Sequence, residues 1–560
     1  MTTASVFETP IDPDMPVGTR VNIGEAFPGV VRPLDWTGVA VPNDFGIRQL
    51  IRDLGLQSVD PPGSWSQRLH RGRAYINLSW VYWQVDGRLP GARPEDMEIG
   101  FFGSPLGVEV TRPPRPSRLE RTLKSPYIGR AIWRAAKAVR GADERLQAAL
   151  NEWTALNPSN LTDAELVDKS VGIREQMVVA AAWHSRSSLS AQSLFGTLRR
   201  LLDKAGVAIE ASTLVDVLSD LGEVESAGPA KRIRELAQRA QAVPGLADEL
   251  RAAPAEEIGK ILRQRAPAID QGLTELVSRY GYRSGTEYLI TAPSWAEDPT
   301  PVLKAFQGLA SRPMDSPGAS ARSRADAERQ LLGPCARRVR EPARLLLRAA
   351  QAAVRAREAT KATCIIRVDM ERRCVREAAS RLYSRDRIES PADVCFLTIE
   401  ELEAAVRGSN TDLSSTVRER SEEAAALEAS PEPAALIDGV MPLKFEQPSG
   451  NTDVDIMHGI GVCAGLVEGH ARVAHTLDDL VEMRDGEILV APYTDAGWTP
   501  YFTIAGAVVV ATGGLMSHCA VVAREVGVPA IVNATDVLQR VRTGDRVRVD
   551  ADAGTVQLLH

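Results

Sequence analysis

Residues 512–529 read Thr512-Gly513-Gly514-Leu515-Met516-Ser517-His518-Cys519-Ala520-Val521-Val522-Ala523-Arg524-Glu525-Val526-Gly527-Val528-Pro529. An apolar run ends at Ala511, and the two glycines that follow permit a tight turn. Ser517 predicts a helix N-cap, because its hydroxyl can accept a hydrogen bond from an amide of the first turn. Gly527 and Pro529 predict the end of that helix. His518 is therefore expected in the first turn of a short helix.

This position favours a particular histidine chemistry. The start of a helix carries unpaired amides and a positive partial charge, which together favour a bound anion and a neutral, nucleophilic imidazole. A phosphoryl group on the ring would meet the amides of Gly513 and Gly514 and the hydroxyls of Thr512 and Ser517. Of the seven histidines, only His518 follows a Gly-Gly turn. The pattern predicts a transient phosphohistidine.

Amino-acid composition and the spacing of apolar residues divide the chain into four parts. Residues 1–115 are rich in Pro and Gly with short apolar runs, which predicts irregular structure with a few strands. Residues 116–423 show apolar spacings of three and four, typical of a large helical domain. Residues 424–454 have a linker composition, and residues 455–560 alternate short β runs with turns. We expect a multidomain protein with a largely α-helical domain and a small C-terminal α/β domain.

Composition excludes several classes of protein. The 560 residues carry 66 Lys and Arg against 73 Asp and Glu, a net charge of −7, so no positive field recruits nucleic acid or an anionic membrane. No apolar run approaches the roughly 20 residues that span a bilayer, and the first residues hold no signal core, so a cytoplasmic location is expected. The six cysteines show no spacing typical of zinc, and no metal is expected.

An Arg-rich block covers residues 321–390, with 18 basic and 9 acidic residues. Two interpretations of this excess stay open. It is either a solvated basic helix face or a surface for an anionic substrate or partner.

Residues 512–529, with a hairpin ending at Leu559, resemble the mobile phosphohistidine domain of the phosphoenolpyruvate synthase and pyruvate phosphate dikinase superfamily. That family's signature is T-x-G-G-x-x-S/T/C-H followed by A-x-V/I-A-R-E-x-G-x-P. Other segments resemble the rifampicin phosphotransferases: Asn22 to Gly29, Arg73 to Asn77, Gly281 to Glu287 with Trp295 to Pro299, Arg357-Glu358-Ala359-Thr360-Lys361, and Pro492 to Pro500. The resemblance implies a swivelling C-terminal domain whose His518 carries the phosphoryl group.

The resemblance also implies roles in an acceptor site. Arg357 and Lys361 are four residues apart, so on a helix they share one face and are expected to grip the phosphoryl group. Arg283 is expected to be a second phosphate or carboxylate clamp. Tyr282 stands where the family has His, and it is expected in an aromatic lining or in a hydrogen bond to the substrate.

The remaining site residues rest on weaker patterns. Three candidates for a general base, His184, Glu287 and Asp495, are not separable from sequence, and Glu287 is also a candidate for substrate binding. An aromatic wall is expected from Trp80, Tyr82 and Trp83 with Tyr282, the alternative being that these residues are plain core.

Single-chain members of the family contain an ATP-grasp domain, and neither its features nor a GxxxxGK[ST] phosphate loop occurs in this sequence. The expectation is therefore an acceptor and phosphohistidine subunit of a two-component dikinase. Mg-ATP would bind a separate ATP-grasp subunit, and the β-phosphoryl would pass through His518 to a small phenol, leaving AMP and phosphate. Rifampicin-type phosphorylation and a non-catalytic phosphocarrier are the alternatives.

Overall fold

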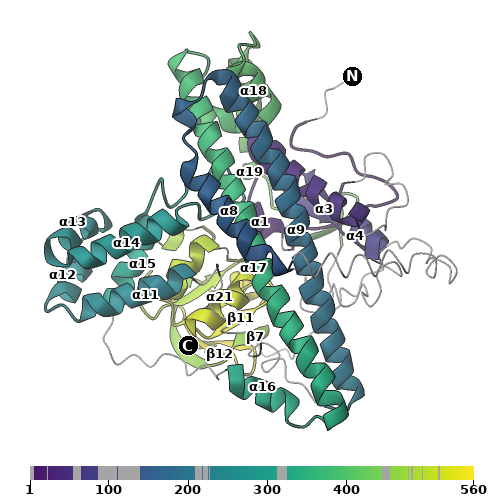
Figure 1. The fold of residues 1–560 in the computed structure, drawn as a ribbon, viewed down its shortest axis with the longest axis vertical. Helices are drawn as coiled ribbons and strands as arrows, with labels where there is room; N and C mark the ends of the chain where they lie inside the picture. The colour runs from purple at the N-terminus through teal and green to yellow at the C-terminus, as the bar shows by residue number, and fades with distance from the viewer. Residues whose placement is uncertain are drawn as a thin grey trace.

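The computed structural model describes residues 5–21, 23–53, 65–85, 110, 139–207, 217, 225, 228–311, 324–443, 455–476, 478–480, 483–494, 496–514 and 517–559. Within these ranges, the helical part of the chain is built on two long helices, α9 (Asp163–Lys204) and α17 (Arg337–Ser384). They run antiparallel along one another, with Arg381 near the end of α17 donating to Asp163 at the start of α9 over 2.9 Å (Figure 1). This pair is the scaffold of the molecule.

Shorter helices pack around the long pair. Leu198, Leu347 and Val354, which the spacing pattern predicts on helix faces, are buried between α9 and α17 near one end. The helices α8 (Ala142–Ala155) and α3 (Val41–Asp53) pack against the pair, and α16 (Arg324–Leu332), α18 (Ile399–Val406) and α19 (Leu413–Ala429) complete its ends.

A separate helical cluster lies between the two long helices in sequence. It comprises α11 (Gly228–Gln241), α12 (Leu246–Ala252), α13 (Ala255–Arg265), α14 (Pro267–Tyr280) and α15 (Thr300–Ala310). Its own apolar core includes Ile233, Leu262 and Phe306. The segment between α14 and α15, residues 281–299, is an irregular loop, and we call residues 281–298 the acceptor loop.

The N-terminal part forms a small sheet that the C-terminal end of the helical region completes. The strand order is β2 (Gln67–His70), β3 (Arg73–Asn77), β1 (Val17–Thr19), β4 (Leu436–Asp438) and β5 (Met441–Pro442), with α1 (Ile23–Ala26), α2 (Pro33–Asp35) and α4 (Leu78–Val85) beside it. The predicted linker 424–454 is therefore wrong over 424–443: α19 continues to Ala429, and β4 pairs with β1 because Leu436 and Ile437 bury apolar side chains there. Residues 444–454 lie outside the described part.

The C-terminal domain is an eight-stranded sheet of order β6-β13-β12-β8-β9-β10-β11-β7. The strands are β6 (Ile456–His458), β7 (Ile460–Cys463), β8 (Leu466–Val473), β9 (Ile488–Ala491), β10 (Ala507–Val510), β11 (Ala530–Val532), β12 (Arg546–Asp550) and β13 (Thr555–Leu559). Only Gly459 separates β6 from β7, yet they lie at opposite ends of this order, so the sheet curls on itself. At the closing point a Cβ atom on Gly461 would stand 1.8 Å from the Ala551 carbonyl oxygen, which explains the glycine.

Both faces of the central strands are buried. Val509 and Ile488 face one apolar cluster, whereas Val508 and Leu489 face a second cluster that includes Ala520 and Val522 of α21 (His518–Val526). Such two-sided burial explains the continuous apolar runs of these strands. The short helices α20 (Thr499–Phe502) and α22 (Val537–Arg540) complete the domain.

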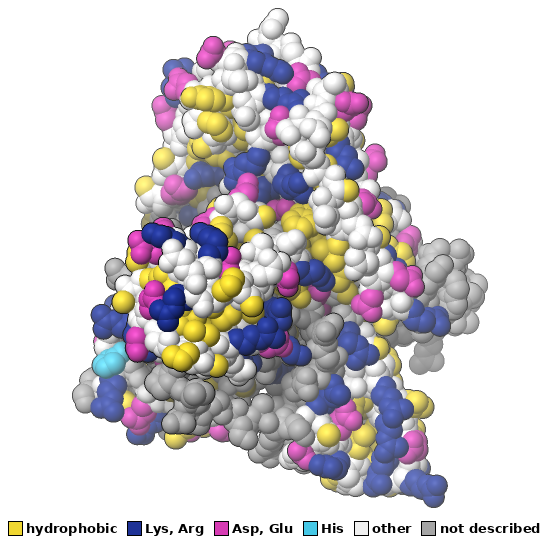
Figure 2. Space-filling view, turned by 60° about the vertical axis from the view of Figure 1, so that its left-hand side comes forward, with side chains coloured by type: hydrophobic (Ala, Val, Ile, Leu, Met, Phe, Trp, Pro, Cys, Tyr) yellow, Lys and Arg dark blue, Asp and Glu magenta, His cyan; other side chains and the backbone are white. Residues whose placement is uncertain are grey.

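In Figure 1 the C-terminal domain lies between the α11–α15 cluster and the lower half of the α9/α17 pair. Among the described residues, no helix combines the length and apolar character needed to cross a bilayer. The basic block is partly internal, because Arg367, Arg372 and Arg381 pair with acidic residues. Figure 2 shows Lys and Arg side chains at the lower end of the molecule, where α17 begins with the exposed Arg337 and Arg338.

Candidate functional site

The helix that begins at His518 has the predicted local structure. Ser517 is its N-cap and accepts a hydrogen bond from the Ala520 amide, and Gly527 ends it with a positive φ of 75°. Gly513 has a φ of 131°, which favours glycine, and the Thr512 hydroxyl donates to the Pro492 carbonyl over 2.9 Å. Thr512 therefore anchors the turn to the preceding loop. The imidazole of His518 lies outside the described part of the structure, as do Leu515 and Met516.

A cavity of about 290 Å³ lies where the C-terminal domain meets the helical and N-terminal parts. Ser517, the N-cap of α21, and Val521 of α21 line it together with residues from α1, α9, α17, the acceptor loop and the N-terminal sheet. The lining residues are Ile23, Glu25, Ala26, Phe27, Asn43, Ile47, Gln67, Ile76, His184, Ser185, Glu287, Tyr288, Arg357, Glu358, Lys361, Thr494, Ser517 and Val521. The residues that flank His518 in α21 thus share one cavity with Arg357 and Lys361.

Both cations of the cavity are paired with carboxylates. The Lys361 Nζ atom lies 3.3 Å from Glu287 Oε2, and the Arg357 guanidinium donates to Glu358 Oε1 over 2.7 Å. The structure therefore brings Arg357, Lys361 and Glu287 to one cavity, although Glu287 and Lys361 are 74 positions apart in the sequence. A bound anion would compete with these carboxylates for the two cations.

Two titratable groups of the cavity are strongly perturbed. Burial raises the pKa of Glu25 to about 7, even though Lys361 and Arg357 act to lower it. Burial, followed by the charges of Arg357 and Lys361, lowers the pKa of His184 to about 3. At neutral pH His184 is therefore an uncharged imidazole, and Glu25 is divided between its acid and its carboxylate.

Arg283 does not line the cavity, and its expected role as a phosphate clamp is corrected. Its guanidinium is buried, donating to Glu287 Oε1 over 2.8 Å and to the Glu225 carbonyl over 2.8 Å. Tyr282 is also buried: its hydroxyl donates to Glu225 Oε1 over 2.7 Å and its ring packs edge-on against Trp153. Because both side chains are buried outside the cavity lining and bond to Glu225 and Glu287, Arg283 and Tyr282 hold the acceptor loop in place.

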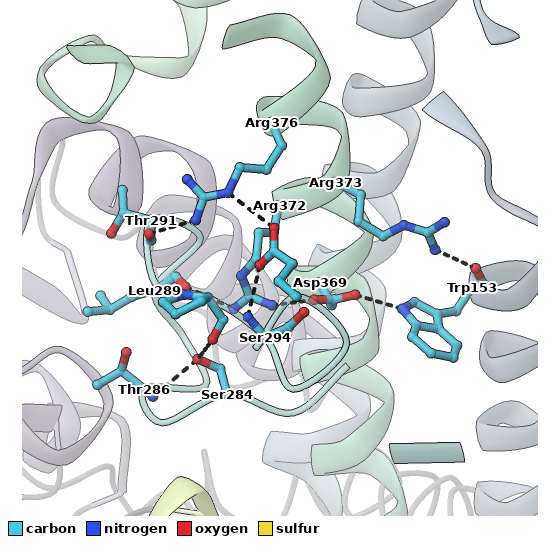
Figure 3. A network of polar contacts seen from close by, with 12 residues as sticks. Trp153, Ser284, Thr286, Leu289, Thr291, Ser294, Asp369, Arg372, Arg373 and Arg376 are labelled. Carbon is cyan, nitrogen blue, oxygen red and sulfur yellow. Dashed lines mark hydrogen bonds and ion pairs between the residues drawn. The ribbon is translucent and has the colours of Figure 1, made fainter. Parts of the chain in front are cut away.

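The acceptor loop is also fixed by α17, as Figure 3 shows. Arg372 donates to the Leu289 carbonyl and Arg376 to the Thr291 carbonyl, each over 2.9 Å. From the other side of the loop, the buried Asp35 accepts from the Thr291 amide and hydroxyl. Glu287 and Tyr288 are thus presented to the cavity from a rigid segment.

The aromatic wall consists of other residues than those expected. Trp80 is buried with Met15 and Leu50, and Trp83 packs against that same cluster. Tyr82 belongs to a second cluster with Val17 and Leu436. All three are described, and none lines the cavity, so the plain-core alternative holds for them. The cavity's aromatic side chains are Phe27 and Tyr288, whose ring centroids are 6.0 Å apart.

Sequence reasoning missed several lining residues. Glu25 and Phe27 stand inside the quoted segment Asn22 to Gly29, and Tyr288 directly follows Glu287, so their signal was proximity to a motif. Gln67 carried no signal. Its Oε1 atom and the His184 Nδ1 atom are buried without a hydrogen-bond partner among the described residues, so both are available to a ligand in the cavity. Asp495, the third general-base candidate, lies outside the described residues.

The C-terminal domain is docked beside the cavity by contacts between side chains of one part and the backbone of the other. Arg234 of α11 donates to the Val526 carbonyl at the end of α21 over 2.8 Å. A Cβ atom on Gly308 of α15 would stand 2.4 Å from Ile504 Cγ2. These contacts hold α21 with its N-terminus at the cavity.

Residues 483–554, which contain His518, match the family model described as PEP-utilising enzyme, mobile domain. The resemblance to the PEP-utilising enzymes is confirmed. Residues 180–358 match the model described as rifampicin phosphotransferase fourth domain. The mobile domain and the fourth-domain segment thus both line the cavity, the first through Ser517 and the second through His184 and Arg357.

Similar proteins cover different shares of the chain. An uncharacterised protein of Mycobacterium tuberculosis is 27% identical over 99% of this chain and 62% of its own length. A rifampicin phosphotransferase of Streptomyces sp. is 30% identical over 50% of this chain and 34% of its own length. The prodigiosin synthesizing transferase PigC of Serratia marcescens is 29% identical over 50% and 32%. This chain therefore spans less than two thirds of each of these relatives.

Among solved structures, the holo-form of Thermococcus kodakaraensis aconitase X aligns with 19% of this chain and 98% of its own chain, at 22% identity. The TM-score of 0.16 is too low to carry an argument.

Proposed function

We propose that His518 receives a phosphoryl group and passes it to a hydroxyl group of a small organic acceptor bound in the cavity. The observation that supports this most is the shared lining: Ser517 and Val521, on either side of His518 in the sequence, line the same cavity as Arg357 and Lys361. A phosphoryl donor and a pair of cations would then meet in one cavity.

The two cations supply what such a transfer requires. Catalysis of phosphoryl transfer rests mainly on positioning and on neutralising charge at the transferred group. Arg357 and Lys361 lie on one face of α17, and Glu358 and Glu287 hold them in place when no anion is bound. The phosphoryl group would draw both cations from these carboxylates as it arrives.

The size and lining of the cavity favour a small aromatic acceptor. Its volume of about 290 Å³ is at the low end for small-molecule pockets, whose volumes are roughly 300–1,000 Å³. Phe27 and Tyr288 provide apolar aromatic surface, and Gln67 Oε1 and His184 Nδ1 offer unpaired polar atoms. A phenolic hydroxyl, as in phenol or 4-hydroxyacetophenone, also ionises more readily than an alkanol, with a pKa of about 10.

The donor in this proposal is Mg-ATP bound by a separate ATP-grasp subunit. The β-phosphoryl would move to His518, and AMP and phosphate would be left. Calorimetry of this chain with Mg-ATP alone is expected to show no binding, and micromolar binding would contradict it.

The transfer is testable without the partner. Phosphoramidate, a small phosphoryl donor that modifies histidine directly, is used to charge the protein, and intact mass and acid lability report a phosphohistidine. The phosphohistidine is expected in wild type and not in His518→Ala. Addition of 4-hydroxyacetophenone should then discharge the protein and yield an aryl phosphate visible by ³¹P NMR. A phosphohistidine that persists in His518→Ala would overturn the assignment of His518 as the phosphoryl carrier.

A second candidate is favoured by the fourth-domain match over residues 180–358, namely phosphorylation of rifampicin. The same charged protein distinguishes the two, because only the true acceptor discharges it. Discharge by rifampicin and not by phenols would establish the second candidate. Discharge by neither, with phosphate passing to a protein, would indicate a phosphocarrier.

A further inference from the structure

We infer that Glu25 is the general base of this site and takes the proton of the acceptor hydroxyl. The inference rests on the proposed function. Glu25 lies in α1 and lines the cavity, together with Arg357 and Lys361 of α17 and with Ser517 of the mobile domain. Its charge is felt both by Cys519, the residue after His518, and by the two cations. Glu25 thus shares the cavity with the cations that would receive the phosphoryl group and lies near the helix that begins at His518.

The other carboxylates of the cavity are occupied. Glu287 accepts from Arg283 and pairs with Lys361, and Glu358 accepts from Arg357 over 2.7 Å. A carboxylate that already holds a cation has fewer oxygen lone pairs free to accept the proton of a hydroxyl group. For Glu25, in contrast, the structure shows no hydrogen bond or ion pair within the described residues.

The charged neighbours of His184 exclude this histidine as the general base. His184 lies close to Arg357 and Lys361, and these charges with burial oppose a proton on its ring. An imidazole whose pKa is lowered to about 3 is a poor proton acceptor at neutral pH. Glu25, whose pKa burial raises to about 7, has the affinity that a general base needs near pH 7.

The step balances without a further reactant. The acceptor O–H bond breaks and its proton goes to the Glu25 carboxylate, while the oxygen forms a bond to phosphorus. The P–N bond to the histidine ring breaks, and its electron pair returns to the ring nitrogen. The acceptor leaves as a phosphate ester, and protonated Glu25 returns its proton to solvent.

The test is a single-turnover discharge of phosphoramidate-charged protein by a series of phenols of decreasing pKa. Glu25→Gln is expected to take up its charge as wild type does but to discharge onto phenol roughly 100-fold more slowly, the lower range for general base catalysis. The defect should shrink toward none with 4-nitrophenol, which is already largely ionised at pH 8. A structural role for Glu25 would slow every phenol equally, and that result would overturn the inference.

The pH profile provides a second readout. The groups that face Glu25 are Lys361, Arg357 and Glu358 on α17, His184 on α9, Glu287 and Tyr288 in the acceptor loop and Cys519 on α21. Wild-type discharge onto phenol should rise with pH to a plateau above an apparent pKa near 7, and Glu25→Gln should lack this rise. An unchanged profile in the variant would contradict the assignment.

Controls distinguish a failure of this inference from a failure of the proposed function. Glu249→Gln changes a half-exposed carboxylate of α12 that pairs with Arg265, and it should discharge like wild type. If Glu25→Gln does not fold, Glu25→Asp is tested with the same phenols. Its discharge rate relative to wild type should again be lowest for the least acidic phenol. If wild type charges but no hydroxyl compound discharges it, the proposed function fails. If wild type discharges and Glu25→Gln matches it for every phenol, only the inference fails.

Discussion

Gly497 of the mobile domain lies so close to Gly285 of the acceptor loop that a Cβ atom on Gly497 would stand 2.1 Å from the Gly285 Cα atom. The same Cβ atom would stand 2.7 Å from the Ser284 carbonyl oxygen. Thr494 and Glu287, which flank this contact in the sequence, both line the cavity. The two glycines therefore let the mobile domain approach closely enough to close the site.

Replacement of Gly497 by Ala should weaken docking of the mobile domain, because the atoms it would meet are backbone and cannot rotate away. We expect phosphoramidate to charge His518 as in wild type, and discharge onto 4-hydroxyacetophenone to slow by at least tenfold. The matched control is Gly172→Ala in α9, where a Cβ atom meets nothing within 4 Å. Equal discharge rates for Gly497→Ala and wild type would show that the docked arrangement is not the reactive one.

Loss of either cavity cation should slow transfer of the phosphoryl group from His518 to the acceptor and leave phosphorylation of His518 unchanged. Arg357→Ala and Lys361→Ala are each expected to slow discharge onto a phenol by roughly 100-fold, as for the loss of one transition-state donor. The control is Arg355→Ala, which removes an exposed arginine two residues from Arg357 on the same helix. If both cavity variants instead fail to accept phosphate from the partner and still discharge normally, these cations belong to the partner interface.

Arg283→Ala should act on stability, because it leaves the buried Glu287 with one cation fewer and opens the acceptor loop. Removing one member of a buried ion pair costs on the order of 3–5 kcal/mol of unfolding free energy. Arg329→Ala, which breaks an exposed pair with Asp326, should cost less than about 1 kcal/mol. Urea denaturation of both variants provides the measurement. A variant at Arg283 that is as stable as wild type, with weakened phosphate binding, would restore the clamp role.

Glu25 should make the protein less stable as pH rises. Its folded pKa of about 7 lies above the ordinary value of 4.5, so between these values the folded state holds a proton that the unfolded state has lost. The stabilisation from that proton is present below pH 4.5 and is lost as pH rises through 7. Glu25→Gln should therefore gain stability over wild type from pH 5 to pH 8, by on the order of 1–3 kcal/mol. Urea denaturation at both pH values measures this, and a difference that does not change with pH would contradict the perturbed pKa.

Local patterns predicted the elements that carry the phosphohistidine motif. The helix start at Ser517 and its end at Gly527 depend on residues within one turn of each terminus, so the sequence contains all of their determinants. The strands at Ile488–Ala491, Ala507–Val510 and Ala530–Val532 lie within about one residue of their apolar runs, because both faces of these strands are buried. The placement of Arg357 and Lys361 on one helix face followed from their spacing of four residues.

Other features depended on contacts between distant segments. The sequence contained both halves of the pair Arg283–Glu287, but only the fold turned Arg283 inward onto Glu225 and left Glu287 in the lining of the cavity. The linker composition of residues 424–454 did not reveal that Leu436 and Ile437 would join the N-terminal sheet, because strand pairing over more than 400 residues leaves no local pattern.

The sequence by itself determined that His518 starts a capped helix after a Gly-Gly turn and that Arg357 and Lys361 share a helix face, because these features arise from interactions within a few residues. Only the tertiary structure decided that Glu25, Gln67 and Tyr288 line the cavity beside these cations and that Trp80, Tyr82 and Trp83 do not. The physical reason is that burial and the electrostatic effect of a neighbour depend on distance in space. The packing of α1, α9, α17 and the mobile domain sets those distances.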